Sequence, residues 1–294
     1  MDTAFQVPES FIKMSGHGND FIIVDNSTET YSTDWSDTAR RWCPRRTGIG
    51  ADGLLVISPV KRGDFKLRIF NADGSEAEMC GNGARCAAAF AARHNIAGTK
   101  MEFETLAGMI KARIRGEDVA IRLTDSILTH KQCLWIEAEG NEFPVYTVNT
   151  GVPHAIVFID MIRGGSEFTA RLHEYPKSLV DFVGRTLRFH EAFRPAGTNV
   201  DLVEVIGPGE IRVRTYERGV EEETLACGTG AVAAAVISHQ HKNVGEPPVS
   251  VHMPGGTLTV DFIEHHTYVT HIWLKGKVDW IYRGNIFHEE DVVT

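Results

Sequence analysis

Two cysteines in this sequence stand at the head of similar glycine- and alanine-rich stretches, "AEMCGNGARCAAAFAA" (77–92) and "LACGTGAVAAAVIS" (225–238). Aligned on Cys80 and Cys227, the two stretches agree at six of nine positions. The cysteines lie 227 − 80 = 147 residues apart, which is half of the 294-residue chain. A duplication of one supersecondary unit explains this spacing better than chance does.

The chemistry of such a pair follows from where each cysteine would lie. At the first residue of a helix, unpaired backbone N–H groups and the helix dipole lower the pKa of a thiol. The glycines that follow allow a carboxylate to approach the same amides closely. If the two halves face each other, a bound carboxylate would place its α-carbon between two sulfur atoms. One thiolate could then remove the α-proton while the other thiol protonates the opposite face, and the amides would stabilise the enolate.

The other cysteines and the histidines suggest no further chemistry. We interpret Cys43, Cys86 and Cys133 as small buried apolar side chains. An odd number of cysteines without a disulfide framework indicates a reducing compartment. The histidine-rich stretch 265–271 does not match a zinc-binding spacing, so we expect a solvated strand and no metal site. A protein that binds carboxylates in the amide nests without chemistry remains an alternative, although it gives no role to both thiols.

Composition limits the classes of protein that fit. The chain is long enough for two domains, and 43% hydrophobic with 23% charged residues is typical of a soluble globular protein. A net charge of −9 argues against nucleic acid or an anionic membrane as a partner. There is no signal-peptide pattern, no membrane-length apolar run and no phosphate-binding glycine motif. We therefore expect a cytoplasmic protein that acts on a small molecule.

Most segments have the alternation and turn residues of short strands, as in "DFIIVD" (20–25), "GLLVIS" (53–58) and "FKLRIF" (65–70). Helices are expected at 33–43, 82–94, 167–174 and 229–239. Each half would thus hold several strands and one buried, alanine-rich helix. This pattern predicts an α+β fold with two similar domains and a boundary between residues 125 and 129.

Seven stretches make the chain resemble the diaminopimelate epimerases, which are amino-acid epimerases independent of pyridoxal phosphate. They are "FIKMSGHGNDFIIVD", "RRTGIGADGLLVI", "RIFNADGSEAEMCGNGARCAAAF", "GVPHAIVF", "GTNVDLVEV", "RVRTYERG" and "ETLACGTGAVAAA". The resemblance implies that each domain is a barrel of strands around a central helix, with domains at 1–127 (joined by a C-terminal strand, 278–294) and 128–277. It also implies a homodimer without cofactor that interconverts LL- and meso-2,6-diaminopimelate in lysine and peptidoglycan-precursor biosynthesis.

The same resemblance implies a role for individual residues. Cys80 and Cys227 would be the two acid/base thiols, with His154 and Glu217 tuning them. The reacting carboxylate would be bound by the backbone amides of Gly81, Asn82, Gly228 and Thr229. The remaining amino and carboxylate groups of the substrate would be bound by Asn19, Asn71, Asn199, Glu217 and Arg218. An arginine can form a bidentate pair with a carboxylate, and a glutamate can pair with an ammonium group.

One departure from the family pattern concerns the substrate. Many members have Gly-Asn-Pro-His where this chain has "GVPH", so Val152 replaces an asparagine that contacts substrate. Valine cannot donate or accept a hydrogen bond. A related racemase that acts on another amino acid, such as histidine or a proline-type substrate, therefore remains open.

Overall fold

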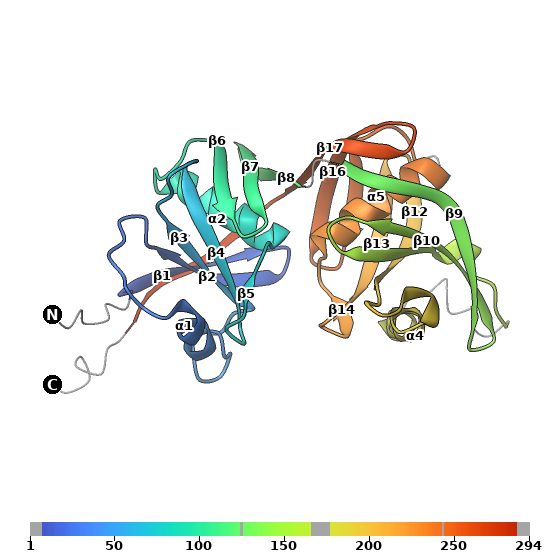
Figure 1. Cartoon of the computed structure of the whole chain (residues 1–294), viewed down its shortest axis with the longest axis horizontal. Coiled ribbons are helices and arrows are strands. Elements are labelled where there is room, and N and C mark those ends of the chain that lie inside the picture. Colours follow the sequence, from blue (N-terminus) through green and yellow to red (C-terminus); the bar gives the residue numbers. More distant parts are fainter. Residues whose placement is uncertain (1–7, 124–125, 166–176, 243, 287–294) are drawn as a thin grey trace. The chain divides into compact units, whose positions relative to one another are not determined.

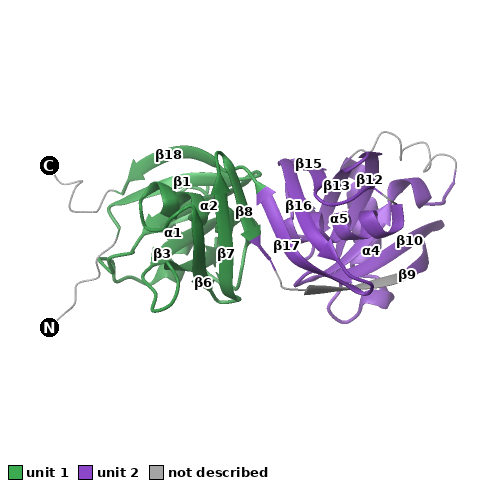
Figure 2. Cartoon of the chain, turned by 90° about the horizontal axis from the view of Figure 1, so that it is seen from above, with its two compact units in different colours: residues 1–121, 276–294 green, residues 122–275 purple. Residues whose placement is uncertain are grey.

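The computed structural model describes residues 8–123, 126–165, 177–242 and 244–286. The chain divides into two compact units, unit 1 (1–121 and 276–294) and unit 2 (122–275) (Figure 2). These boundaries lie a few residues before the expected ones at 127/128 and 277/278. The expected helix at 167–174 lies outside the described residues, and within the described ranges the model has no helix long and apolar enough to cross a membrane.

Unit 1 is a mixed sheet (Figure 1). Its strands are β1 (Ser10–Gly16), β2 (Asn19–Asp25), β3 (Gly53–Ser58), β4 (Phe65–Asn71), β5 (Glu76–Ala77), β6 (Lys100–Thr105), β7 (Gly108–Arg115), β8 (Asp118–Arg122, at the boundary) and β18 (Asp279–Asn285). Pairing runs β18-β1-β2-β3-β4-β6-β7, with β5 also against β4. The β2–β3 and β4–β6 pairs are parallel, and the others are antiparallel.

Unit 2 is a mixed sheet of the same kind. Its strands are β9 (Ser126–Ala138), β10 (Asn141–Asn149), β11 (Pro153–Phe158), β12 (Asn199–Gly207), β13 (Glu210–Glu217), β14 (Glu222–Thr224), β15 (Val249–Met253), β16 (Gly256–Glu264) and β17 (Tyr268–Gly276). Pairing runs β9-β10-β11-β12-β13-β15-β16-β17, with β14 also against β13. Because β17 pairs with β9 again, the ring of strands closes into a barrel.

The two units repeat one another strand by strand. The series β1-β2-β3-β4-β6-β7 of unit 1 has the same parallel and antiparallel steps as the series β10-β11-β12-β13-β15-β16 of unit 2. The short strands β5 and β14 occupy equivalent places. The predicted fold class, an α+β fold with two similar domains, is confirmed.

The central helices begin at the two cysteine motifs. Helix α2 (Gly81–Arg93) contacts β1, β2, β3, β4 and β7, and helix α5 (Gly228–Lys242) contacts β10, β11, β12, β13, β15 and β16. Most of their alanines are completely buried, because only small side chains let a helix fit within a surrounding sheet. Both helices start one residue before the expected position, and α5 extends three residues farther than expected.

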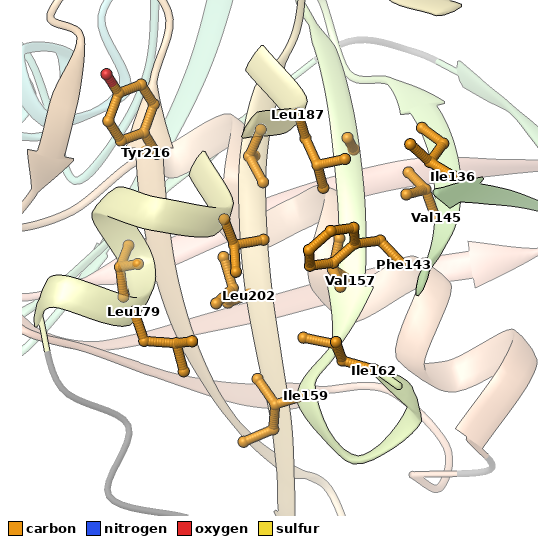
Figure 3. Close-up of a cluster of buried hydrophobic side chains, with 14 residues drawn as sticks. Ile136, Phe143, Val145, Val157, Ile159, Ile162, Leu179, Leu187, Leu202 and Tyr216 are labelled. Atoms are coloured by element: carbon orange, nitrogen blue, oxygen red, sulfur yellow. The ribbon is translucent and has the colours of Figure 1, made fainter. Parts of the chain in front are cut away.

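A second helix in each unit crosses between two parallel strands. Helix α1 (Trp35–Trp42) lies between β2 and β3 in the chain, and helix α4 (Lys177–Arg188) lies between β11 and β12. The apolar face of α4 packs with strand residues in one cluster, shown in Figure 3 (Ile136, Phe143, Val145, Ala155, Val157, Ile159, Ile162, Leu179, Val180, Val183, Leu187, Val200, Leu202 and Tyr216). Sequence analysis missed α4. Helix α4 packs against the strands that carry the unit 2 site.

Candidate active site

Cys80 is the N-cap of α2 in unit 1. Its backbone is extended (φ −138°, ψ 119°), and its sulfur accepts a hydrogen bond from the Gly83 N–H at 3.5 Å. The thiol also lies 3.7 Å from Oδ1 of Asn19, which accepts a second hydrogen bond from the Asn82 amide at 3.3 Å. Three predicted site residues, Asn19, Cys80 and Asn82, therefore form one cluster at the start of α2, beside Gly81.

A group of charged side chains fixes the Asn19 amide. Its Nδ2 donates to Asp52 at 2.8 Å, so Oδ1 is the atom directed toward Cys80. Arg45 bridges Asp52 and Asp20 with 2.7 Å contacts, and the buried Lys13 lies 2.8 Å from Asp20. The orientation of a neutral amide is thus decided by ion pairs behind it.

A buried arginine lies within the same helix. Arg85 has no exposed surface, and its Nη2 donates to Asn82 Oδ1 at 2.7 Å and lies 3.2 Å from Nδ1 of His17. Among the described residues, its Nε and Nη1 have no hydrogen-bond partner. Burial lowers the pKa of Arg85 to about 10, and charge on the Cys86 and Cys80 thiols opposes this shift. A cation is therefore held close to the Cys80 sulfur without a carboxylate to neutralise it.

Asn71, at the end of β4, was also predicted to bind substrate. Its side chain donates to the Ser75 hydroxyl at 2.9 Å, and its backbone N–H donates to the Ser75 carbonyl. These contacts close the turn between β4 and β5. Among the described residues, no hydrogen bond joins Asn71 to the Asn19–Cys80–Asn82 cluster, so its substrate role stays a prediction.

Cys227 stands before α5 in unit 2, as Cys80 does before α2. Its residue is 6% exposed, and its sulfur lies 3.4 Å from the Thr229 hydroxyl. The expectation that the helix start would lower the thiol pKa is wrong here. Burial raises the pKa of Cys227 far above its usual range, and the charges of Glu217 and Asp201 raise it further, while a hydrogen bond from the Gly230 backbone N–H opposes the shift. Cys227 is consequently a thiol in the free protein.

His154 and Asn199 meet beside this thiol. They lie opposite each other on the parallel strands β11 and β12. Nε2 of His154 is 3.0 Å from the Thr229 hydroxyl, and Nδ1 is 2.6 Å from the carboxylate of Asp201. The predicted residues His154, Asn199, Cys227 and Thr229, next to Gly228, are thus brought together, with Asp201 added by the structure.

Glu217 and Arg218 end β13 at the edge of this cluster. Burial raises the pKa of Glu217. The backbone N–H of Arg218 donates to Asn199 Oδ1 at 2.7 Å, and its guanidinium donates to the Ala196 carbonyl at 3.2 Å. The Glu217 carboxyl therefore lies close enough to raise the pKa of Cys227, and Arg218 contacts the cluster through its backbone N–H.

Comparison with known sequences identifies the family. The sequence profile of "Diaminopimelate epimerase" matches residues 11–127 and 146–281. The chain belongs to the diaminopimelate epimerase family. Proteins named diaminopimelate epimerase from Aquifex aeolicus (strain VF5) and Archaeoglobus fulgidus are 40% and 37% identical to it. These matches cover 95% and 89% of this chain and 98% and 92% of the relatives. The predicted resemblance is confirmed, and the chain is an isomerase of this family.

The chain also shares its fold with solved structures of low sequence identity. A Bacillus anthracis phenazine biosynthesis protein of the PhzF family superposes with a TM-score of 0.66 at 14% identity, over 96% of this chain and all of that one. A hydroxyproline epimerase from Agrobacterium vitis superposes with a TM-score of 0.60 at 16% identity, over 95% of this chain and 92% of that one. At these identities the likeness concerns the fold alone.

Sequence analysis missed three groups that surround the thiols, namely Asp201, Arg85 and Asp52. Asp201 had a detectable signal, since it is a lone carboxylate in the apolar strand "NVDLVEV" and alternates with Asn199. Arg85 lies among small residues, where local sequence carries no sign of its burial, and the exposed Asp52 acts on the Cys80 site only through its contact with Asn19. Val152, the departure from the family pattern, is half-buried in the turn between β10 and β11, and its carbonyl accepts the Thr150 N–H at 3.1 Å.

Proposed function

We propose that this protein interconverts LL- and meso-2,6-diaminopimelate by proton transfer at one α-carbon, with Cys80 and Cys227 as the two acid/base groups. The observation that carries the proposal is the repeated placement of a cysteine at the start of a buried central helix, in a chain of this family. Inversion of a stereocentre requires a base and an acid on opposite faces of the carbon, so both thiols must reach the same substrate atom.

The remaining site residues fit this reaction by their chemistry. The enolate that forms on α-proton removal carries its charge on the carboxylate, where backbone amides of Gly81, Asn82, Gly228 and Thr229 would stabilise it. The distal aminocarboxylate needs one partner for an ammonium group and one for a carboxylate, and Glu217 and Arg218 offer them at the edge of unit 2. The chemistry needs no cofactor, and a homodimer stays a prediction.

The first experiment assays the purified protein with LL-2,6-diaminopimelate in deuterium oxide. Chiral chromatography should show conversion to the meso form, and mass spectrometry should show one deuterium in each product molecule. Cys80→Ala and Cys227→Ala should each reduce the rate about 10³-fold, because one acid or base is then missing. Cys133→Ala is the matched control, since this thiol is free and lies apart from both helix starts. A Cys80→Ala or Cys227→Ala variant with full activity would contradict the proposal.

A second candidate function follows from Val152, which lacks the polar group that many family members have. The same assay should therefore include histidine, proline and hydroxyproline. Racemisation of one of these without action on diaminopimelate would favour a related racemase. Calorimetric binding of a carboxylate without any α-proton exchange would favour a binding protein.

A further inference from the structure

A chain of hydrogen bonds links a buried carboxylate to the Cys227 thiol within unit 2. Asp201 Oδ2 lies 2.6 Å from His154 Nδ1, and His154 Nε2 lies 3.0 Å from the Thr229 hydroxyl. That hydroxyl lies 3.4 Å from Cys227 Sγ. The side chains of Asp201 and His154 have no exposed surface, so no solvent competes for these contacts.

Asp201 has a hydrogen-bond partner on each of its two oxygens. Its Oδ1 accepts the Thr215 hydroxyl at 2.6 Å, and its Oδ2 faces the His154 ring. A carboxylate that accepts on both oxygens requires the His154 Nδ1 to carry a proton. Helix α5 fixes this carboxylate in place, because a Cβ on Gly230 would lie only 2.4 Å from Asp201 Oδ1.

The orientation of the Asn199 side chain shows whether Nε2 of His154 carries a proton. Its Oδ1 accepts the backbone N–H of Arg218 at 2.7 Å, which assigns the opposite atom as the amide nitrogen. That nitrogen donates to the Pro153 carbonyl at 3.3 Å and lies 3.4 Å from His154 Nε2. The Asn199 amide is thus a donor that faces Nε2, so Nε2 is an acceptor and the Thr229 hydroxyl is the donor in its contact with His154. His154 is neutral with its proton on Nδ1.

The proton on the thiol follows from this tautomer. Because the Thr229 hydroxyl donates to His154, its lone pairs face Cys227, and the thiol is the donor in that contact. A thiolate at Cys227 would accept a hydrogen bond from Thr229 only if Thr229 gave up its bond to His154. We infer that Asp201 is a positioning residue that, through His154 and Thr229, holds Cys227 as the protonated thiol when the site is empty.

The consequence for the reaction rests on the proposed function. With Cys227 as the acid, Cys80 acts as the base: its thiol, which donates to Asn19 Oδ1 in the structure, first loses that proton to solvent, and the thiolate then takes the α-proton as the Cα–H bond breaks and an S–H bond forms. Cys227 gives its proton to the opposite face of the carbon and is left as the thiolate. The electron pair of the original Cα–H bond ends in the new Cα–H bond. Charged groups around Cys227 agree with this assignment, since the neighbouring Glu217 and Asp201 are carboxyls and His154 is neutral.

The test measures the thiol and the ring directly, without substrate. Alkylation by iodoacetamide, followed by peptide mass spectrometry, gives the rate for each cysteine in the same protein. Asp201→Asn should speed alkylation of Cys227 about tenfold at fixed pH, because the charge that disfavours the thiolate is gone. Thr229→Val, which removes the hydroxyl, should change the rate at which Cys227 is alkylated. Thr229→Ser should leave this rate unchanged, because serine keeps the hydroxyl.

Two measurements separate positioning from simple loosening of the fold. The alkylation rates of Cys80 and Cys133 should stay unchanged in every variant, and so should the urea midpoint of Thr229→Ser. Nitrogen-15 spectra of histidine-labelled wild-type protein should show His154 protonated at Nδ1 alone, with His154→Gln used for assignment.

An Nε2 proton on His154 in the wild-type protein, or an unchanged Cys227 rate in Asp201→Asn, would overturn the inference. Absence of epimerase activity alongside the expected alkylation rates and spectra would instead reject the proposed function and leave the proton placement standing.

Discussion

The starts of α2 and α5 present the same backbone N–H group to a cysteine sulfur, but they differ in the charged groups around that sulfur. In both units a cysteine precedes a buried helix, and the N–H three residues later points at its sulfur. Around Cys80 the side chains are neutral amides with the buried cation Arg85. Around Cys227 they are a hydroxyl, a neutral imidazole and two carboxyl groups. The two helix starts therefore offer the same N–H to the sulfur, and at Cys227 burial and the nearby carboxyl groups raise the pKa of the thiol.

The largest effect on stability is expected from the matched glycines Gly83 and Gly230. In Gly230→Ala the new methyl would lie 2.4 Å from Asp201 Oδ1 and 3.1 Å from Thr215 Oγ1, which cannot move freely. In Gly83→Ala it would lie 3.2 Å from the flexible end of Leu55. We expect Gly230→Ala to lower the free energy of unfolding by about 3 kcal/mol. Gly83→Ala should stay within about 1 kcal/mol of wild type, since alanine favours the helix.

Urea unfolding followed by circular dichroism measures both variants. Equal destabilisation by the two alanines would show that the carboxylate is no more tightly enclosed than the leucine. It would thereby remove the packing difference between the two units.

The next effect concerns the ion pairs that orient Asn19 in unit 1. Burial alone would raise the pKa of Asp20, but hydrogen bonds and charge from Arg45 and Lys13 outweigh burial and hold it well below its usual range. Asp20 therefore contributes stability above its unfolded pKa and loses that contribution as the pH falls. Asp20→Asn should destabilise the protein by about 2 kcal/mol at pH 7, because Lys13 loses a buried partner.

This difference should shrink below about pH 4, where Asp20 in the unfolded chain becomes protonated. Urea midpoints of wild type and variant at pH 7 and pH 3 test the sign. Asp37→Asn is a matched control, because Asp37 forms only exposed ion pairs on α1. A constant difference across this range would mean that Asp20 acts through packing and not through its charge.

The smallest expected effect tests the difference in charge around the two cysteine sulfur atoms. Arg85→Met should slow the alkylation of Cys80 about tenfold, because the cation that favours the thiolate is replaced by an apolar group of similar length. The Cys227 rate should not change, since Arg85 is not among the groups that shift the Cys227 pKa. Arg85→Lys, which keeps the charge, should restore most of the Cys80 rate. Equal slowing by lysine and methionine would assign Arg85 a purely structural role.

Much of this architecture could be predicted from local sequence. The Cys-Gly-x-Gly stretches located both central helices to within one residue at their start, because capping geometry and alanine propensity act over a few neighbouring residues. The strands around Phe21, Leu55 and Leu67 were likewise visible from their apolar runs. Helix α4 was missed, since its buried face is defined only by the strands that it covers.

The surroundings of the thiols could not be predicted in the same way. His154 and Asp201 are 47 residues apart, and Asn19 and Cys80 are 61 residues apart. Nothing in the local pattern sets the distance between such pairs, because strand pairing brings them together. The expectation that both thiol pKa values would be lowered failed at Cys227 for this reason. It considered the helix start and not the burial of the thiol or the carboxyl groups delivered by β12 and β13.

The sequence by itself determined the family, the duplicated fold and the two cysteines, because each depends on short stretches of chain whose meaning is local. Only the tertiary structure decided which charges and proton donors face each sulfur. A thiol responds to every charged group within a few ångströms, whatever its place in the sequence, and those groups come together only when the strands pair.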